Sequence, residues 1–129
     1  MHDESRMKQP SLTKSFAHAW RGMHLTFQAE RNFRIQIAVG LAVILCSWAF
    51  PLTHTERLVL LIVTMMVIVL ELLNTAVERL VDLMKPRLID VAGDIKDVMA
   101  GAVLLASLFA IVIGVAIFSP HILYMIRRV

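Results

Sequence analysis

The sequence predicts an all-α integral membrane protein, a single domain over residues 1–129 with an amphipathic surface helix followed by three transmembrane helices. Of the 129 residues, 58% are hydrophobic, and the mean hydropathy is positive, which is more than the core of a soluble domain of this size needs. Three apolar segments are each long enough to cross a bilayer core of about 30 Å, for which a helix needs about 20 residues. The segment before them has the spacing of an amphipathic helix.

Residues 11–31 have the pattern of a helix that lies in the membrane interface. Apolar residues recur there at three- and four-residue steps: Leu12, Phe16, Ala19, Trp20, Met23 and Phe27. Polar residues such as Lys14 lie between them, Trp20 is expected at headgroup depth, and Ser11 is expected to be the N-cap. A soluble helix packed on a partner is the alternative. Residues 1–10 are expected to be a flexible N-terminus without a removable signal peptide, because they contain no apolar run with a cleavage site.

The three predicted spans cover about residues 33–52, 58–83 and 98–117. Six basic residues lie at or before the start of the first span, whereas the link between the first two spans contains only Arg57. The link between the second and third spans contains Lys85 and Arg87. Because cytoplasmic segments carry the excess of Lys and Arg, the N-terminus and the second link are predicted to face the cytoplasm. The C-terminus is then outside, although Arg127 and Arg128 argue weakly against that.

Four polar residues form one stripe on the second span: Glu71, Asn74, Glu78 and Asp82. At 100° per residue they fall within about 60° of one another on a helical wheel. A carboxylate near lipid costs several kcal/mol unless it faces a protein interior, a metal or a water-filled site. For Asp82, simple exposure to water beside Arg79 and Lys85 is an equal alternative. Glu71 lies about 20 Å along the helix from Leu58, which favours chemistry just below the headgroups, such as chemistry on a lipid hydroxyl.

A second acidic cluster lies at the start of the third span. Asp94, Lys96 and Asp97 stand there, near Gly93 and Gly101. Carboxylates and a lysine can hold Mg²⁺ and nucleotide phosphates, but a solvated helix start has the same composition. The net charge of +3 is spread along the chain, so no nucleic-acid partner is expected, and the single Cys46 excludes a disulfide framework.

Beyond these physical arguments, the polar residues carry a resemblance to a known family. Its motif residues are Glu71-Leu72-Leu73-Asn74-Thr75-Ala76-Val77-Glu78, Asp82, Gly93-Asp94-Ile95-Lys96-Asp97 and Ala100-Gly101-Ala102-Val103. Upstream, Trp20-Arg21-Gly22 and Glu30-Arg31-Asn32 with Arg34 extend the similarity over nearly the whole chain. The sequence resembles the small prokaryotic diacylglycerol kinase family, which includes undecaprenol kinases. These enzymes are unrelated to P-loop kinases, so the lack of a Gly-rich loop is no objection.

The resemblance implies a lipid kinase that transfers the γ-phosphate of MgATP to the hydroxyl of a membrane lipid alcohol. Such a protein would be a homotrimer in the cytoplasmic membrane of a prokaryote, with Mg²⁺ as its cofactor. The implied catalytic base is Glu71, and the implied metal ligands are Glu30 and Glu78. The implied nucleotide contacts are Glu30, Asn74, Glu78, Lys96 and Asp97. Asp82 matches an acidic position of unassigned role.

The chain departs from the family pattern at three places. Arg87-Leu88-Ile89 stands where the family often has a Tyr-His pair, which leaves the adenine contact undefined. Gln36 replaces an acid of the diacylglycerol branch, and Ser11 replaces an arginine. Glu30-Arg31-Asn32 is closer to the undecaprenol branch, so the acceptor stays open between diacylglycerol and undecaprenol, with a slight preference for undecaprenol.

The sequence also bears on oligomerisation and on rival functions. Three spans of one subunit can hardly enclose the polar stripe, so a neighbouring surface is expected to cover it. A small-residue face on the third span, within or between subunits, favours close packing: Ala102, Ala106, Ala110 and Gly114. A proton-coupled transporter that uses Glu71 is the alternative from another class, and a noncatalytic assembly protein is the third.

Overall fold

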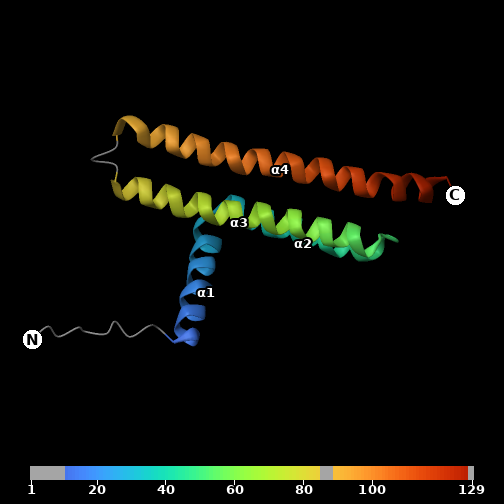
Figure 1. The fold of residues 1–129 in the computed structure, drawn as a ribbon, viewed down its shortest axis with the longest axis horizontal. Coiled ribbons are helices and arrows are strands. Elements are labelled where there is room, and N and C mark those ends of the chain that lie inside the picture. The colour runs from blue at the N-terminus through green and yellow to red at the C-terminus, as the bar shows by residue number, and fades with distance from the viewer. Residues whose placement is uncertain (1–10, 85–88, 128–129) are drawn as a thin grey trace, which may run out of the picture.

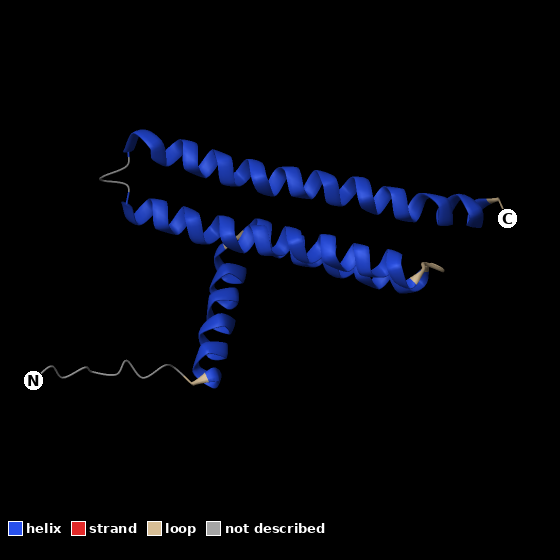
Figure 2. Ribbon diagram, in the orientation of Figure 1, coloured by secondary structure: helices blue, strands red, loops and turns tan. Residues whose placement is uncertain are grey.

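The computed structural model describes residues 11–84 and 89–127, and these form helices without a strand (Figure 2). The helices are, in chain order, α1 (Leu12–Ala29), α2 (Arg31–Ala49), α3 (His54–Met84) and α4 (Ile89–Ile126). The predicted flexible segment, residues 1–10, lies outside the described residues, and so do Lys85, Arg87, Leu88 and Arg128.

Helix α3 is central: it packs against both α2 and α4, while α1 leaves the bundle crosswise and contacts α2 and α3 (Figure 1). We call the end of the bundle where α1 joins the α1 end, and the end formed by residues 47–57 and 118–127 the far end. Three of the described helices are long and apolar enough to cross a membrane. The predicted all-α integral membrane fold, with a first helix separate from three spans, is therefore confirmed.

The helices extend beyond the apolar segments that predict them. Helix α3 has 31 residues and α4 has 38, so at about 1.5 Å per residue they are about 46 and 57 Å long, against a bilayer core of about 30 Å. Helix α4 begins at Ile89, before the predicted start of the third span at about residue 98. Its first turns are polar and still helical, because a helix can continue beyond the hydrocarbon into water. Helix α4 also continues through Pro120, which removes one backbone hydrogen bond, a loss that membrane helices tolerate.

A sharp corner joins α1 to α2 at a single residue, Glu30, whose backbone is extended (φ −104°, ψ 117°). Arg34, one turn into α2, donates from Nη1 to the carbonyls of Phe27 and Gln28, both at 3.0 Å. A guanidinium on the last carbonyls of a helix satisfies groups that have no partner within the helix and favours its negative end. Arg34 therefore fixes the angle at which α1 leaves the bundle.

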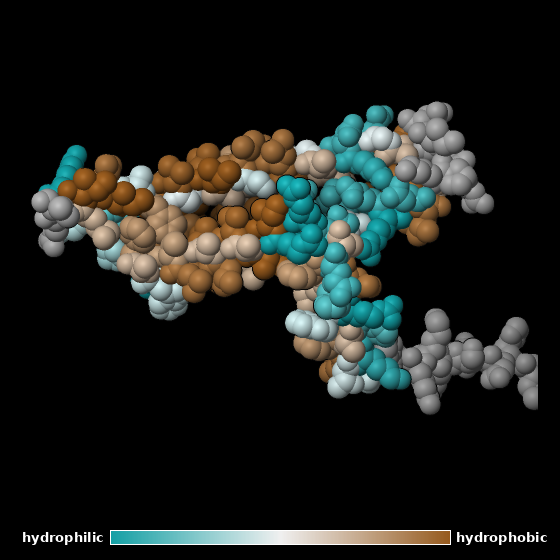
Figure 3. All heavy atoms as spheres, turned by 180° about the vertical axis from the view of Figure 1, so that it is seen from behind, coloured by the Kyte–Doolittle hydropathy of each residue, from teal (hydrophilic) through white to brown (hydrophobic). Residues whose placement is uncertain are grey.

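The first helix exposes its apolar stripe. Leu12 is 90%, Phe16 73% and Trp20 62% exposed, which fits a helix lying on a membrane and equally a helix that awaits a partner. Polar residues gather over α1 and the neighbouring ends of α3 and α4, whereas apolar residues cover the rest of the bundle (Figure 3). Ser11 occupies the N-cap position, but its side chain caps no backbone N–H; its hydroxyl lies 2.9 Å from Thr13 Oγ1 instead.

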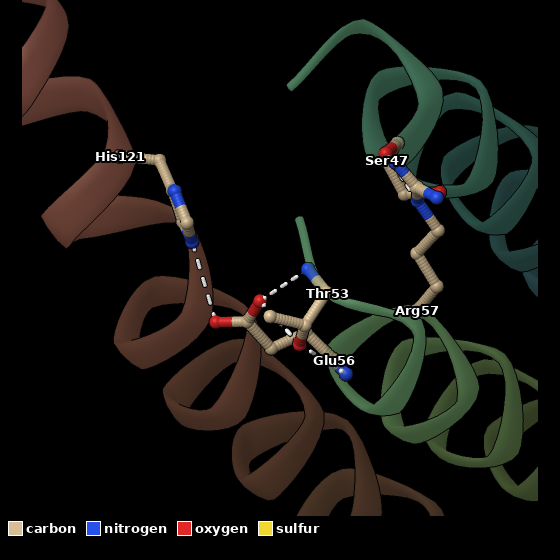
Figure 4. A network of polar contacts seen from close by, with 5 residues as sticks. All are labelled: Ser47, Thr53, Glu56, Arg57 and His121. Carbon is tan, nitrogen blue, oxygen red and sulfur yellow. Dashed lines mark hydrogen bonds and ion pairs between the residues drawn. The ribbon is translucent and has the colours of Figure 1, made fainter. Parts of the chain in front are cut away.

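Polar contacts tie the far end together (Figure 4). Glu56 on α3 lies 3.3 Å from His121 on α4 and accepts hydrogen bonds from the backbone N–H and hydroxyl of Thr53. Thr53 Oγ1 in turn accepts from the Glu56 N–H at 3.3 Å, so the two residues form a capping box. Arg57 donates to the Ser47 carbonyl of α2 at 3.1 Å. These contacts hold both neighbours of α3 at this end.

The predicted small-residue face of α4 points into the chain's own bundle. Ala106 is buried, and α3 is the helix that packs on α4. Ala110 and Gly114 line a partly open cavity between the helices, and a Cβ at Gly114 would meet nothing within 4 Å. The face therefore gives close packing at Ala106 and open space further along.

Candidate functional site

Glu71 is a buried carboxylate in the middle of the bundle. It lies on α3, is 3% exposed, and accepts a hydrogen bond at Oε2 from Nε2 of Gln36 on α2, at 3.1 Å. One turn later, the Thr75 hydroxyl donates to the Glu71 carbonyl at 3.0 Å, within α3 itself. The carboxylate is thus held from a second helix, while its other oxygen is left for further contacts.

A second amide–carboxylate pair lies one turn along α3. Asn74 is 9% exposed, and its Nδ2 donates to Glu78 Oε1 at 3.1 Å. In both pairs the amide NH₂ faces the carboxylate, so the amide oxygens face elsewhere. Gln36 Oε1 and Asn74 Oδ1 are buried without a hydrogen-bond partner. An unsatisfied buried acceptor costs about 1–3 kcal/mol, and such groups commonly mark a ligand or water site.

These side chains surround a cavity of about 280 Å³, which we call the polar cavity. Its polar walls are Asn32, Glu71, Asn74 and Glu78. Helix α4 closes it with Ala100, Val103, Leu104 and Ser107. The structure therefore brings together three of the predicted site residues, and it adds Asn32 and Ser107.

Glu30 belongs to the same neighbourhood. It is half-buried at the α1–α2 corner, and the negative charges of Glu78 and Glu30 both act on the Glu71 carboxylate. Because Glu30 is the residue between α1 and α2, Glu71 lies near the level at which α1 joins the bundle. If α1 lies in the membrane interface, Glu71 lies close to the headgroups.

Lys96 and Asp82 form a separate contact beyond the polar cavity. Lys96 Nζ on α4 lies 2.7 Å from Asp82 Oδ1 on α3, with both side chains partly exposed. Asp94 and Asp97 are exposed, and neither lines the polar cavity. The second acidic cluster thus lies outside the cavity that contains Glu71. For Asp82, the structure gives Lys96 as a partner; of the two expected partners, Lys85 lies outside the described residues.

An apolar cavity of about 620 Å³ adjoins the polar one, running between α2, α3 and α4. Ser107 lines both cavities. Gln36 lines the apolar cavity and bonds Glu71 in the polar one. A carboxylate and two unpaired amide oxygens therefore stand beside a space suited to a hydrocarbon chain.

The residues present suit a magnesium ion that is shared with phosphate. Within residues 11–84 and 89–127, no three His, Cys, Asp or Glu side chains converge as metal ligands. Magnesium does not need such a cage, since it usually takes one or two carboxylates and completes its shell with phosphate oxygens and water. Glu78, with the unpaired Asn74 oxygen beside it, offers hard oxygen ligands of that kind.

The structure meets the expectation about how the polar stripe is covered only in part. The polar stripe was expected to need a neighbouring subunit to cover it, yet the chain's own α2 and α4 bury Glu71 and Asn74. The stripe is only half enclosed further on, since Glu78 is half-buried and Asp82 exposed. Helix α4 packs along α3, so one chain buries Glu71 and Asn74 but leaves the cavity partly open, and a neighbouring subunit at Glu78 and Asp82 stays a prediction.

Three residues of the site were not predicted as site residues from the sequence: Asn32, Gln36 and Ser107. Gln36 is a lone amide within an otherwise apolar stretch, Ile35 to Gly40, and that isolation was a usable signal. Ser107 is a weaker signal of a site, because serines are common in membrane helices, where the hydroxyl often bonds a carbonyl of the preceding turn. The Ser107 hydroxyl does so here, donating to the Val103 carbonyl.

Taken together, these features define a multi-pass helical membrane protein with a buried carboxylate–amide site at the level of its surface helix. The sequence pattern of the prokaryotic diacylglycerol kinase family matches residues 17–118, and the chain belongs to that family. The resemblance seen in the motifs is thereby confirmed.

Named relatives are found in several bacteria. A diacylglycerol kinase of Synechocystis sp. is 40% identical over 115 residues, which cover 88% of this chain and 66% of the relative. The undecaprenol kinase of Bacillus subtilis is 38% identical over 109 residues, covering 84% of this chain and 89% of the relative. The diacylglycerol kinase of Escherichia coli K12 is 29% identical over 111 residues, covering 85% and 90%. The chain thus spans about two thirds of the Synechocystis relative and nearly all of the other two.

Proposed function

We propose that this protein is a lipid kinase that transfers the γ-phosphate of MgATP to the hydroxyl of diacylglycerol or undecaprenol. The observation that carries the proposal is the buried Glu71 carboxylate, which Gln36 holds at the border between the polar and apolar cavities. A lipid with an apolar chain and a hydroxyl suits this border, because its chain can lie in the apolar cavity and its hydroxyl can reach Glu71. Family membership supports the same reaction class.

In the proposed reaction Glu71 is the general base. It accepts the hydroxyl proton as the lipid oxygen bonds to the γ-phosphorus and the bond from that phosphorus to the ADP oxygen breaks. Phosphoryl transfer needs positioning and charge neutralisation more than covalent chemistry, so one placed carboxylate suffices on the acceptor side. A positioned base contributes about 10²- to 10⁴-fold to the rate.

We assign Glu30 and Glu78 to Mg²⁺, which would neutralise charge on the phosphate oxygens. Asn74 lies beside Glu78 in the polar cavity, and we assign it, together with Glu30 and Glu78, to the nucleotide. Lys96 and Asp97 are proposed to contact the nucleotide from the start of α4. For Lys96 this requires that its bond to Asp82 opens or that one ammonium serves both groups.

The family resemblance supports an assembly and a location for this protein. We propose a homotrimer in the cytoplasmic membrane of a prokaryote, with the N-terminus in the cytoplasm and the apolar surface of the bundle (Figure 3) against lipid. Native mass spectrometry in detergent should give three times the 14.5 kDa mass of the chain. A monomer with full activity would contradict the homotrimer.

The decisive experiment is phosphate transfer by purified protein in mixed micelles, with diacylglycerol and undecaprenol offered in parallel. We expect transfer to at least one lipid, and a loss of about 10²-fold or more in Glu71→Gln. No transfer to either lipid would overturn the proposal. A proton-coupled transporter would instead lose a proton-gradient response in Glu71→Gln and show no ATP use in either form.

A further inference from the structure

Gln36 has an unusual position for a glutamine. It lies near the start of α2, lines the larger cavity, whose walls are mostly apolar, and donates to the Glu71 carboxylate 35 residues away in sequence. Among the described residues, it is the side chain that hydrogen-bonds the Glu71 carboxylate. If packing were its purpose, an apolar side chain of the same length would serve equally well without leaving a polar atom unsatisfied.

The geometry fixes the orientation of the amide. An ionised carboxylate can only accept hydrogen bonds, so Gln36 must present Nε2 to Glu71, and Oε1 is left buried without a donor. This unsatisfied acceptor costs about 1–3 kcal/mol. Glu71 Oε2 is engaged by Gln36, which leaves Oε1 to meet a substrate hydroxyl.

We propose that Gln36 is a positioning residue of the phosphoryl transfer: it fixes the Glu71 carboxylate at the border of the two cavities so that Glu71 Oε1 receives the proton of the acceptor lipid. Gln36 acts through Glu71, and the inference rests on the proposed function. Gln36 stands at a position where the diacylglycerol branch has an acid, and positioning Glu71 gives this glutamine a defined role. Replacing Gln36 should affect the step at the lipid hydroxyl and not the binding of MgATP, because Gln36 faces the apolar cavity.

The charges around Glu71 allow the effect of Gln36 to be isolated. The titratable groups that act on it are Glu78 on α3 and Glu30 at the α1–α2 corner. The described residues of α4 that line the polar cavity are Ala100, Val103, Leu104 and Ser107, and none of these four is titratable. Both glutamates stay in place in a Gln36 variant, so any change in the behaviour of Glu71 arises from the lost amide.

The first test measures kinetics in Gln36→Met, which keeps the length and apolar contacts but removes the donor. We expect kcat to fall about 10- to 100-fold, the KM for MgATP to stay within about twofold, and the acid limb of the rate–pH profile to move to higher pH. The profile moves because the ionised form of Glu71 loses the hydrogen bond from Gln36 that favours it over the protonated form. Gln36→Glu, which places a second carboxylate there, should move the profile further in the same direction.

Gln28→Met is the matched control, because Gln28 is an exposed glutamine on α1 that contacts His24, at 2.9 Å. It should leave kcat and the rate–pH profile unchanged. A Gln36→Met variant with wild-type kcat and profile would overturn the inference. So would a lower kcat with an unmoved profile, since that is the result of a purely structural role.

A second readout does not depend on activity. A hydrophobic carbodiimide reacts with protonated carboxyl groups in membranes, and mass spectrometry reports the modified fraction at Glu71. In Gln36→Met, Glu71 should be labelled up to a higher pH than in the wild type, whereas Gln28→Met should match the wild type. Identical labelling profiles in all three proteins would sink the inference even if the kinase activity is confirmed. Absent phosphate transfer with a shifted labelling profile would instead refute the proposed function alone.

Discussion

Single residues of this protein combine burial with unsatisfied hydrogen-bonding capacity. Glu71 is among the least exposed residues, and two amide oxygens near it have no donor. Stability alone disfavours such an arrangement, because apolar residues of similar shape would avoid the loss. The proposed function explains why the arrangement is kept, because a site that binds a hydroxyl and a phosphate needs such groups unpaired. Their spacing in the sequence predicted that Glu71, Asn74 and Glu78 lie on one face of a helix, and in the structure they line one cavity.

Lys96 offers a residue-scale prediction, because the structure bonds it to Asp82 and the family resemblance assigns it to the nucleotide. If it contacts phosphate, Lys96→Met should raise the KM for MgATP by about 10- to 100-fold, the range expected for a lost charge-assisted hydrogen bond. Asp82→Asn removes the charge of the protein partner but leaves the lysine, so it should change that KM by less than about threefold. Steady-state kinetics at saturating lipid gives both values. Equal effects of the two substitutions would show that Lys96 serves only the α3–α4 contact.

The helices themselves were largely predictable from apolar length and periodicity, because a bilayer forces each long apolar segment to satisfy its own backbone. Their ends were not. A capping box at Thr53 and Glu56 begins α3, and its Thr-x-x-Glu pattern is a signal for a helix start that the sequence does carry. Pro120 does not end α4. The corner at Glu30 depends on Arg34 reaching back to α1, a contact between helices that no local pattern reports.

Gly40 provides the prediction at the scale of helix packing. A Cβ added there would lie 2.5 Å from Thr64 Cγ2, so Gly40→Ala forces α2 and α3 apart or turns Thr64. We expect a loss of about 1–3 kcal/mol, seen as a lower midpoint of thermal unfolding in detergent. Gly22→Ala is the matched control, since nothing lies within 4 Å of its Cβ and Ala favours a helix by about 1 kcal/mol over Gly. Adding Thr64→Ala to Gly40→Ala should recover most of the lost stability, because it removes the methyl group that clashes. If the double variant is no more stable than Gly40→Ala, the clash is not the cause.

At the scale of the whole molecule, charge and shape agree on which end is which. The basic residues of the α1 end, Arg21, Arg31, Arg34, Arg79 and Lys96, outnumber Arg57 and Arg127 of the far end. The same end carries α1 and the polar cavity, and the far end is closed by Glu56 and His121 (Figures 1 and 4). The sequence predicted the order of the spans, which the structure confirms, and an orientation in the membrane, which stays a prediction. It could not show that one chain encloses Glu71, because that depends on how α4 lies along α3.

The orientation can be tested with single cysteines in a Cys46→Ser background, since Cys46 is the chain's one cysteine. Lys14→Cys places a thiol on the exposed polar side of α1, and Thr55→Cys places one in the exposed first turn of α3 at the far end. With the positive-rich end in the cytoplasm, an impermeant maleimide should label position 55 in right-side-out vesicles and position 14 in inverted ones. Both should react fully after detergent is added. The reverse pattern would put the polar cavity outside the cell, away from ATP, and would contradict the proposed kinase reaction together with the orientation.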